Sequence, residues 1–126
     1  MPAQSYQLLI WLDKSARLRI GALGEYAFCR GLYVYSGSAR RGMEGRLRRH
    51  LCNEKRQRWH IDYLLMAAAA RVIDLRVSDT TECTLHQSLP GHLPVPGFGA
   101  SDCQQGCGSH LRFLGEVPFC PWLPAQ

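Results

Sequence analysis

Hydrophobic and polar positions alternate along the first third of the chain, and this pattern predicts strands. Residues 6–12 are apolar on both faces, which is typical of a strand that is covered on both sides. Residues 17–20 predict a short second strand that forms a hairpin with the first. Residues 21–30 then read as a loop, and residues 32–36 as a third strand that ends before a glycine turn at Gly37.

Two further strands are predicted in the second half of the chain. Residues 71–77 alternate, and we expect Ile73, Leu75 and Val77 to point inward. Residues 111–115 predict a last strand. The segment between them carries a short helix and then a proline- and glycine-rich loop.

Helical periodicity indicates three helices. Apolar side chains four residues apart predict an amphipathic helix over residues 43–52, with a stripe made of Met43, Leu47 and Leu51. Residues 58–69 are apolar nearly all round, which is typical of a buried helix. Thr80 or Thr81 is expected to cap a short helix that runs to about Ser88.

Length and composition predict one domain. The chain has 126 residues, 46% of them hydrophobic, which suffices for one compact core and not for two. We expect a single domain over residues 1–126, with the core at about 5–115 and a tail at 116–126. No run approaches the roughly 18 apolar residues of a membrane span, and residues 1–12 lack the charged start of a secretory signal. A cytoplasmic protein with six reduced cysteines is therefore expected, with no membrane partner.

The net charge of +5 is concentrated in one segment. Eight of the 15 Lys and Arg residues lie between positions 40 and 58. Arginine-rich patches suit forked hydrogen bonding to phosphate, so the pattern favours a nucleic-acid partner over a merely solvated helix face. On the helix over 43–52, Arg46 and His50 lie beside the apolar stripe, at the boundary of core and cleft. The residues expected to contact the nucleic-acid backbone are Arg40, Arg41, Arg48, Arg49, Lys55 and Arg56.

Two tyrosines that precede this basic segment in the chain are candidates for catalysis. Tyr33 and Tyr35 point to the same face of their strand, and such pairs alone are typical of half-buried sheet residues. Tyr35, however, lies two residues before Gly37, where the strand ends, and Arg46 follows on the next helix. A phenol there can orient or deprotonate water, and a guanidinium can neutralise charge on a phosphorane.

Three ordered motifs stand out, namely Gly31-Leu32-Tyr33-Val34-Tyr35-Ser36-Gly37-Ser38-Ala39, Arg46-Leu47-Arg48-Arg49-His50-Leu51 and Trp59-His60-Ile61-Asp62-Tyr63-Leu64-Leu65. Taken together, they resemble the GIY-YIG nuclease superfamily and most closely its small Uri-type branch. The similarity extends from Tyr6 to about Phe113. It implies an α/β (α+β) fold with a small three-stranded mixed or antiparallel sheet flanked by helices, and magnesium-dependent hydrolysis of nucleic-acid phosphodiesters.

The resemblance also assigns roles to individual residues. Tyr6 and Tyr35 match the tyrosines of its two strand motifs, and Arg46 and His50 match the helix arginine and histidine. Glu82 stands where the superfamily has its metal-binding glutamate, here for Mg²⁺ or Mn²⁺; its alternative role is to stabilise a helix start. The implied mechanism has a tyrosine, with His50, activating water while Arg46 stabilises the charge. The chain departs from the motifs at Ser5-Tyr6-Gln7, which lacks the usual glycine, and at Ser36, which replaces an aliphatic residue.

Other polar residues allow alternative interpretations. Three thiols and an imidazole could form a tetrahedral zinc site: Cys83, Cys103, Cys107 and His110. A zinc site usually has two pairs of closely spaced ligands, however, and only one such pair is present here. His60 and Asp62 lie 160° apart on a helical wheel, so they form no dyad with each other. We expect one of them to support the catalytic helix through a hydrogen bond.

Three functions remain open from the sequence. The favoured one is an endonuclease that acts on DNA more readily than on RNA, in repair or in mobile-element processing. The second is a non-catalytic nucleic-acid-binding module on the same scaffold. The third is a zinc-stapled interaction domain.

Overall fold

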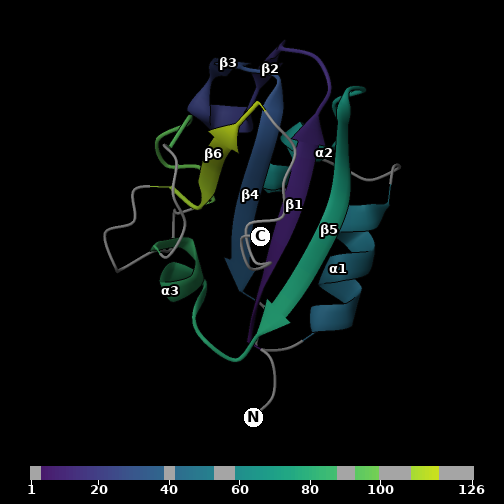
Figure 1. Ribbon diagram of the computed structural model, residues 1–126, viewed down its shortest axis with the longest axis vertical. Coiled ribbons are helices and arrows are strands. Elements are labelled where there is room, and N and C mark those ends of the chain that lie inside the picture. Colours follow the sequence, from purple (N-terminus) through teal and green to yellow (C-terminus); the bar gives the residue numbers. More distant parts are fainter. Residues whose placement is uncertain (1–3, 39–41, 53–58, 88–92, 100–108, 117–126) are drawn as a thin grey trace, which may run out of the picture.

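A computed structural model describes residues 4–38, 42–52, 59–87, 93–99 and 109–116 of this chain. Within these residues, strands precede and follow a pair of helices, and a third helix separates the last two strands (Figure 1). The elements in chain order are β1 (Ser5–Leu12), β2 (Ala16–Arg19), the 3-10 turn η1 (Gly21–Leu23), β3 (Glu25–Phe28), β4 (Gly31–Ser38), α1 (Met43–Leu51), α2 (His60–Leu65), β5 (Ala70–Ser78), α3 (Glu82–Gln87) and β6 (Leu111–Gly115).

The main sheet is antiparallel and has the strand order β5-β1-β4-β6. The predicted α+β class is confirmed, although the sheet has four strands instead of three. The predicted hairpin between residues 17–20 and the first strand is wrong, because β2 pairs with β3 in a separate two-stranded sheet. Residues 25–28, expected to be loop, are strand because Gly24, with φ 101°, closes a turn in which Ile20 N–H donates to the Gly24 carbonyl.

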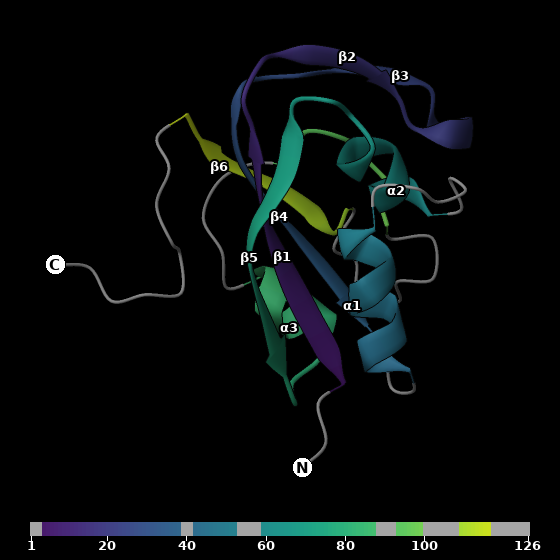
Figure 2. The same ribbon diagram turned by 90° about the vertical axis from the view of Figure 1, so that its right-hand side faces the viewer.

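β1 forms the centre of the core, since both of its faces are covered as predicted. All eight of its residues are buried. One face, with Tyr6, Leu8 and Ile10, belongs to the larger apolar cluster, against which α1 and α2 pack. Leu9 and Trp11 belong to a smaller cluster on the other face. Figure 2 shows α1 and α2 together on one side of the sheet, so the larger cluster lies between the sheet and these helices.

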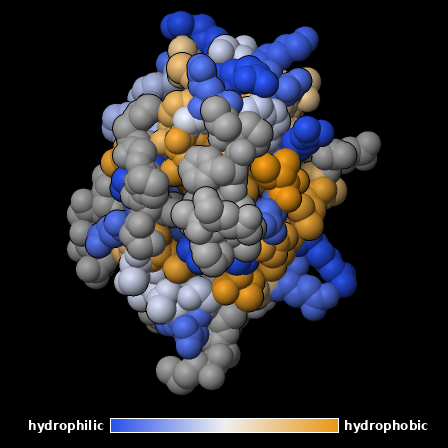
Figure 3. All heavy atoms as spheres, viewed as in Figure 1, coloured by the Kyte–Doolittle hydropathy of each residue, from blue (hydrophilic) through white to orange (hydrophobic). Residues whose placement is uncertain are grey.

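The inward face of β5 was predicted incorrectly at two positions. Ile73 and Val77 are 44% and 48% exposed. The register shifts between Leu9 and Ile10, which pair with Asp74 and Val72, so Ile73 is an extra residue in β5. This bulge interrupts the alternation, and Val72 packs on the core instead of Ile73. Seen as in Figure 3, apolar atoms gather at the surface over β5.

The two helices on the core differ from the prediction at their ends. α1 has the expected span, but Leu51, in its last turn, is 54% exposed. α2 covers only residues 60–65, and Met66 just beyond it is 39% exposed, so this helix is not buried all round. Asp62 accounts for the start of α2 at His60, because its carboxylate accepts the Trp59 N–H at 2.9 Å. In the described ranges no helix is long and apolar enough to span a bilayer.

Candidate functional site

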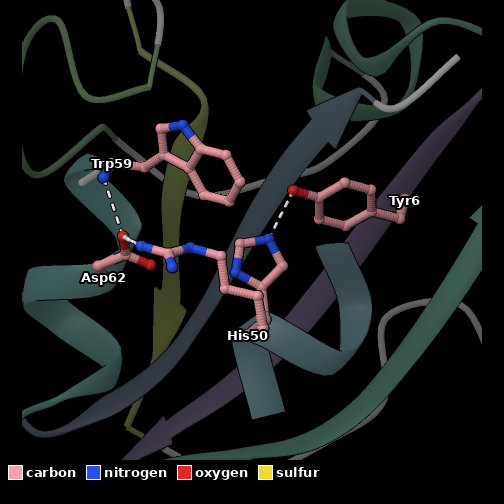
Figure 4. Close-up of polar contacts among 5 residues, drawn as sticks. Tyr6, His50, Trp59 and Asp62 are labelled. Atoms are coloured by element: carbon pink, nitrogen blue, oxygen red, sulfur yellow. Dashed lines mark hydrogen bonds and ion pairs between the residues drawn. The ribbon is translucent and has the colours of Figure 1, made fainter. Parts of the chain in front are cut away.

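A phenol and an imidazole meet where β1 begins. Tyr6 Oη and His50 Nε2 are 2.6 Å apart, and both side chains are buried (Figure 4). Tyr6 comes from β1 and His50 from the last turn of α1, 44 residues later. The contact exists because α1 lies on one side of the sheet with His50 buried on its inner face, as the position of His50 beside the apolar stripe predicted.

Tyr35 joins this pair from the neighbouring strand. Its ring centroid lies 6.2 Å from that of Tyr6 and 6.2 Å from that of His50. Tyr33 points to the same face but lies elsewhere, since its hydroxyl donates to the Cys29 carbonyl at 2.6 Å. Of the two strand tyrosines, only Tyr35 therefore belongs to the cluster with Tyr6 and His50.

Gly37 makes this gathering of rings possible. It pairs with Tyr6 across β1 and β4. A Cβ atom at Gly37 would lie 2.5 Å from Tyr6 Cζ and Oη and 3.0 Å from Tyr35 Cε2. Such separations are well inside van der Waals contact, so only glycine lets the phenol reach His50 here. The glycine that the sequence indicated as a strand end is thus a close-approach position.

Arg46 brings a positive charge to the edge of the cluster. Its guanidinium donates to the Ser38 carbonyl at 3.0 Å and lies 5.0 Å from the ring centroid of Trp59. The guanidinium also acts electrostatically on Tyr6. The carbonyl and the indole fix the side chain at the end of β4, beside the buried phenol. Tyr6, Tyr35, Arg46 and His50, four residues that the resemblance assigned to catalysis, therefore lie together.

Arg49 has a different role from the one predicted. It was expected to make loose contacts with nucleic acid, but its guanidinium bonds Asp62 Oδ2 at 2.8 Å. It also lies 4.9 Å from the ring centroid of Trp59, on which Arg46 packs as well. Asp62 is fully buried and ties α2 to α1 through this ion pair. The expectation that one residue of the pair His60 and Asp62 supports the helix over 43–52 through a hydrogen bond is confirmed for Asp62.

Burial sets the protonation of the two phenols. Burial raises the pKa of Tyr6 to about 12, while the positive charge of Arg46 acts in the opposite direction. Burial also raises the pKa of Tyr35, and the neighbouring Tyr6 adds to that increase. Both side chains are therefore neutral phenols near pH 7. A tyrosine that acts as a general base would need a lowered pKa, whereas the folded protein raises the pKa of both tyrosines.

The rest of the predicted basic surface is only partly described. Arg48 is exposed and forms an ion pair with Glu44 at 2.7 Å, one helical turn away. It remains accessible for phosphate contacts. The other predicted contact residues lie outside the described residues: Arg40, Arg41, Lys55 and Arg56.

Glu82, the predicted metal ligand, starts α3 and is half-buried. α3 contacts β1 and β4, and the Thr80 carbonyl accepts a hydrogen bond from Ser5, the residue before Tyr6. Glu82 thus follows a segment attached to the end of the sheet that carries the cluster. α3 lies beside β4, however, whereas α1 lies behind β5 (Figure 1). Glu82 therefore belongs to a different element from Arg46 and His50, which lie on α1.

The predicted zinc ligands are described in part. Cys83 Sγ and His110 Nε2 are 3.6 Å apart in the interior, whereas Cys103 and Cys107 lie outside the described residues. Sequence reasoning missed His86, which is fully buried and whose ring lies 5.6 Å from that of His110. Burial, with the positive charge of Arg112, lowers the pKa of His86 to about 4. In the described part of the chain, no three His, Cys, Asp or Glu side chains already surround a common metal position.

A loop that sequence reasoning left without a role covers Tyr35. Phe98 packs edge-on against Tyr35, with ring centroids 6.2 Å apart. Gly99, at φ 65°, leaves space for Tyr35, because a Cβ there would lie 2.9 Å from Tyr35 Cε1. The Gly99 N–H donates to His60 Nδ1 at 2.8 Å, so His60 holds this loop in place. The glycine and proline content of this segment predicted a loop but gave no signal for its contact partners.

Comparison with known proteins gives one match. The model of the family described as Domain of unknown function DUF123 matches residues 5–120. No curated protein and no solved structure matches the chain significantly.

Proposed function

The chain belongs to the family described as Domain of unknown function DUF123, a GIY-YIG-like domain family, and we propose that it is a metal-dependent endonuclease of the small Uri-type branch. Its substrate is a nucleic-acid phosphodiester, DNA in preference to RNA. Repair of DNA or processing of mobile elements is the setting that this activity suits.

One observation carries the proposal: Tyr6 Oη lies 2.6 Å from His50 Nε2, beside the guanidinium of Arg46. A phenol bonded to an imidazole can pass a proton, and a fixed guanidinium can stabilise negative charge that develops on phosphate. Simple core packing does not need a buried hydrogen bond of this kind, because an apolar pair would avoid burying polar atoms. The combination therefore supports a chemical role.

The protonation state of Tyr6 defines its role in the proposed reaction. With the Tyr6 pKa at about 12, the phenol is neutral and can hold the attacking water by a hydrogen bond. His50 Nε2 can then receive the proton, through the Tyr6 hydroxyl, as the water attacks phosphorus. Arg46 neutralises the charge of the pentacovalent phosphorus, and the bond from phosphorus to the 3′ oxygen of the sugar then breaks as that oxygen leaves. Tyr35 keeps the Tyr6 ring in place by packing, since its centroid lies 6.2 Å from it.

A divalent ion fits the carboxylate of Glu82, which is half-buried at the start of α3. Mg²⁺ or Mn²⁺ takes oxygen ligands and keeps several waters, so a single carboxylate together with substrate phosphate suits it. When bound, the ion would supply charge neutralisation at the scissile phosphate. This chain's own contribution at that point is one carboxylate oxygen ligand.

A non-catalytic nucleic-acid-binding module is the second candidate, and burial favours it. Tyr6 and His50 are only 1% and 3% exposed, so a phosphodiester reaches them only if neighbouring groups are displaced. Arg46 and Arg48 are more accessible and can contact phosphate without such a displacement. The two candidates share the binding surface and differ in turnover alone.

Cleavage assays distinguish these functions. Nicked, flap, branched and single-stranded DNA, with matching RNA, are incubated with the protein in the presence and absence of Mg²⁺ or Mn²⁺. We expect metal-dependent cleavage of at least one substrate. Arg46→Ala should lower kcat about 100- to 1000-fold, as for removal of one charge-stabilising donor. Glu82→Gln should still bind but not cleave.

Arg17→Ala is the matched control, because Arg17 is exposed on β2 and pairs with Glu25. This variant should cleave as the wild type does. Salt-sensitive binding without cleavage of any substrate would favour the binding module. Full cleavage by Arg46→Ala would reject the assignment of the site.

A further inference from the structure

A second group of polar side chains is buried between α3 and the start of β6, apart from the tyrosine cluster. Cys83 and His86 lie on α3, three residues apart and therefore on one face of the helix. His110 directly precedes β6, and its carbonyl accepts the Ser36 N–H of β4 at 3.0 Å. The three side chains come from residues that are 6%, 0% and 4% exposed, in that order.

The separation between Cys83 and His110 fits two ligands of one metal ion. Zinc binds thiolate at about 2.3 Å and imidazole at about 2.0–2.1 Å, so two such ligands at a tetrahedral angle are about 3.6 Å apart. The distance from Cys83 Sγ to His110 Nε2 is 3.6 Å. A thiol–imidazole hydrogen bond has a similar length, so this distance alone does not identify a metal site.

His86 supplies the second observation. Neither of its ring nitrogens has a hydrogen-bond partner within the described residues, although the side chain is fully buried. Leaving a buried polar group without a partner costs about 1–3 kcal/mol, so such groups call for an explanation. Coordination of a metal through one ring nitrogen would remove part of this cost, because that nitrogen gains a partner.

The spacing of the two histidine rings is also compatible with a shared ion. Two imidazoles on one tetrahedral zinc have ring centroids about 5 Å apart, by the bond lengths given above. The rings of His86 and His110 are 5.6 Å apart. Among the described residues the three side chains do not yet surround one point, so the His86 ring must move before all three donor atoms can reach one ion.

We propose that Cys83, His86 and His110 bind a zinc ion that fastens α3 to the sheet. One thiolate and two imidazoles form a ligand set that selects zinc over magnesium, which takes oxygen ligands. Binding removes the proton from the Cys83 thiol and leaves both imidazoles neutral. The site is structural and does not depend on the proposed nuclease activity, because none of its residues belongs to the tyrosine cluster.

Metal content and thermal stability test the proposal. The full chain is purified with zinc present, freed of loosely held metal by gel filtration with a weak chelator, and analysed by atomic emission. We expect about one zinc per chain in the wild type, and loss of most of it in His86→Phe and Cys83→Ser. Cys29→Ser is the control, because Cys29 is an exposed cysteine on the β3–β4 connection, and it should retain the metal.

His86→Phe also separates a metal site from a merely buried histidine. If zinc binds, a strong chelator lowers the Tm of the wild type and leaves the Tm of His86→Phe unchanged. If no metal binds, phenylalanine removes two unpartnered nitrogens and raises Tm above that of the wild type, whatever the chelator. A wild type without zinc, or a folded His86→Phe that retains it, overturns the proposal. Neither result bears on cleavage with Mg²⁺.

Discussion

Replacing Gly37 with alanine tests the packing on which the tyrosine–histidine cluster depends. The new Cβ would lie 2.5 Å from Tyr6 Cζ and Oη, whereas carbon atoms in contact are about 3.5–4.0 Å apart. The overlap of about 1 Å involves the far end of a ring that is only 1% exposed. Tyr6 must therefore move away from β4, and its hydroxyl must leave His50.

The expected cost follows from these two effects. Overpacking a core costs about 1–3 kcal/mol, and separating a buried hydrogen-bonded pair costs about 1–3 kcal/mol. Because both effects act through the same ring they are not additive, and we expect a loss of about 2–5 kcal/mol in the free energy of unfolding. This is a large share of the roughly 5–15 kcal/mol that stabilises a domain.

Urea unfolding followed by tryptophan fluorescence measures this loss. Gly45→Ala is the matched control: Gly45 lies inside α1, and a Cβ there meets nothing within 4 Å. Alanine should stabilise that helix position by about 0.5–1 kcal/mol. The same unfolding midpoint for Gly37→Ala and the wild type would refute the reasoning, because the phenol would then have room that the geometry denies it.

Two further predictions concern the same region. Burial raises the Tyr6 pKa from 10.0 to about 12, so between these pH values the tyrosine ionises in the unfolded chain but not in the folded protein, and stability falls as pH rises. Between pH 8 and pH 11 the wild type should therefore lose about 1.4 kcal/mol more of its free energy of unfolding than Tyr6→Phe, as measured by urea titrations at each pH. Equal losses in the two proteins would contradict the raised pKa. Asp62→Ala removes the partner of Arg49 and the acceptor of the Trp59 N–H, and should cost about 2–4 kcal/mol. Asp62→Asn keeps a hydrogen-bond acceptor and should lose less of the free energy of unfolding. If Asp62→Ala unfolds within about 0.5 kcal/mol of the wild type, this ion pair contributes little to stability.

The local pattern of apolar and polar residues was sufficient to predict those helices and strands in which the spacing of apolar residues is uninterrupted. The strand over residues 6–12, the third strand before Gly37 and the helix from Met43 were all predicted close to their observed bounds. The pattern failed where one extra residue changes the period, because the bulge at Ile73 places Val72 on the core in its stead. The position of His50 beside the apolar stripe was predictable, because a helical wheel depends only on spacing.

The sequence by itself determined the α+β class, the basic segment and which residue types can do chemistry, because these follow from composition and short periods. Only the tertiary structure decided which side chains meet. In the folded protein His50 contacts the Tyr6 hydroxyl, Arg49 bonds to Asp62, and the buried ring of His86 lies beside that of His110. The physical reason is that such contacts join residues far apart in the chain, and their geometry depends on strand register and on close approaches such as that at Gly37, which no local pattern records.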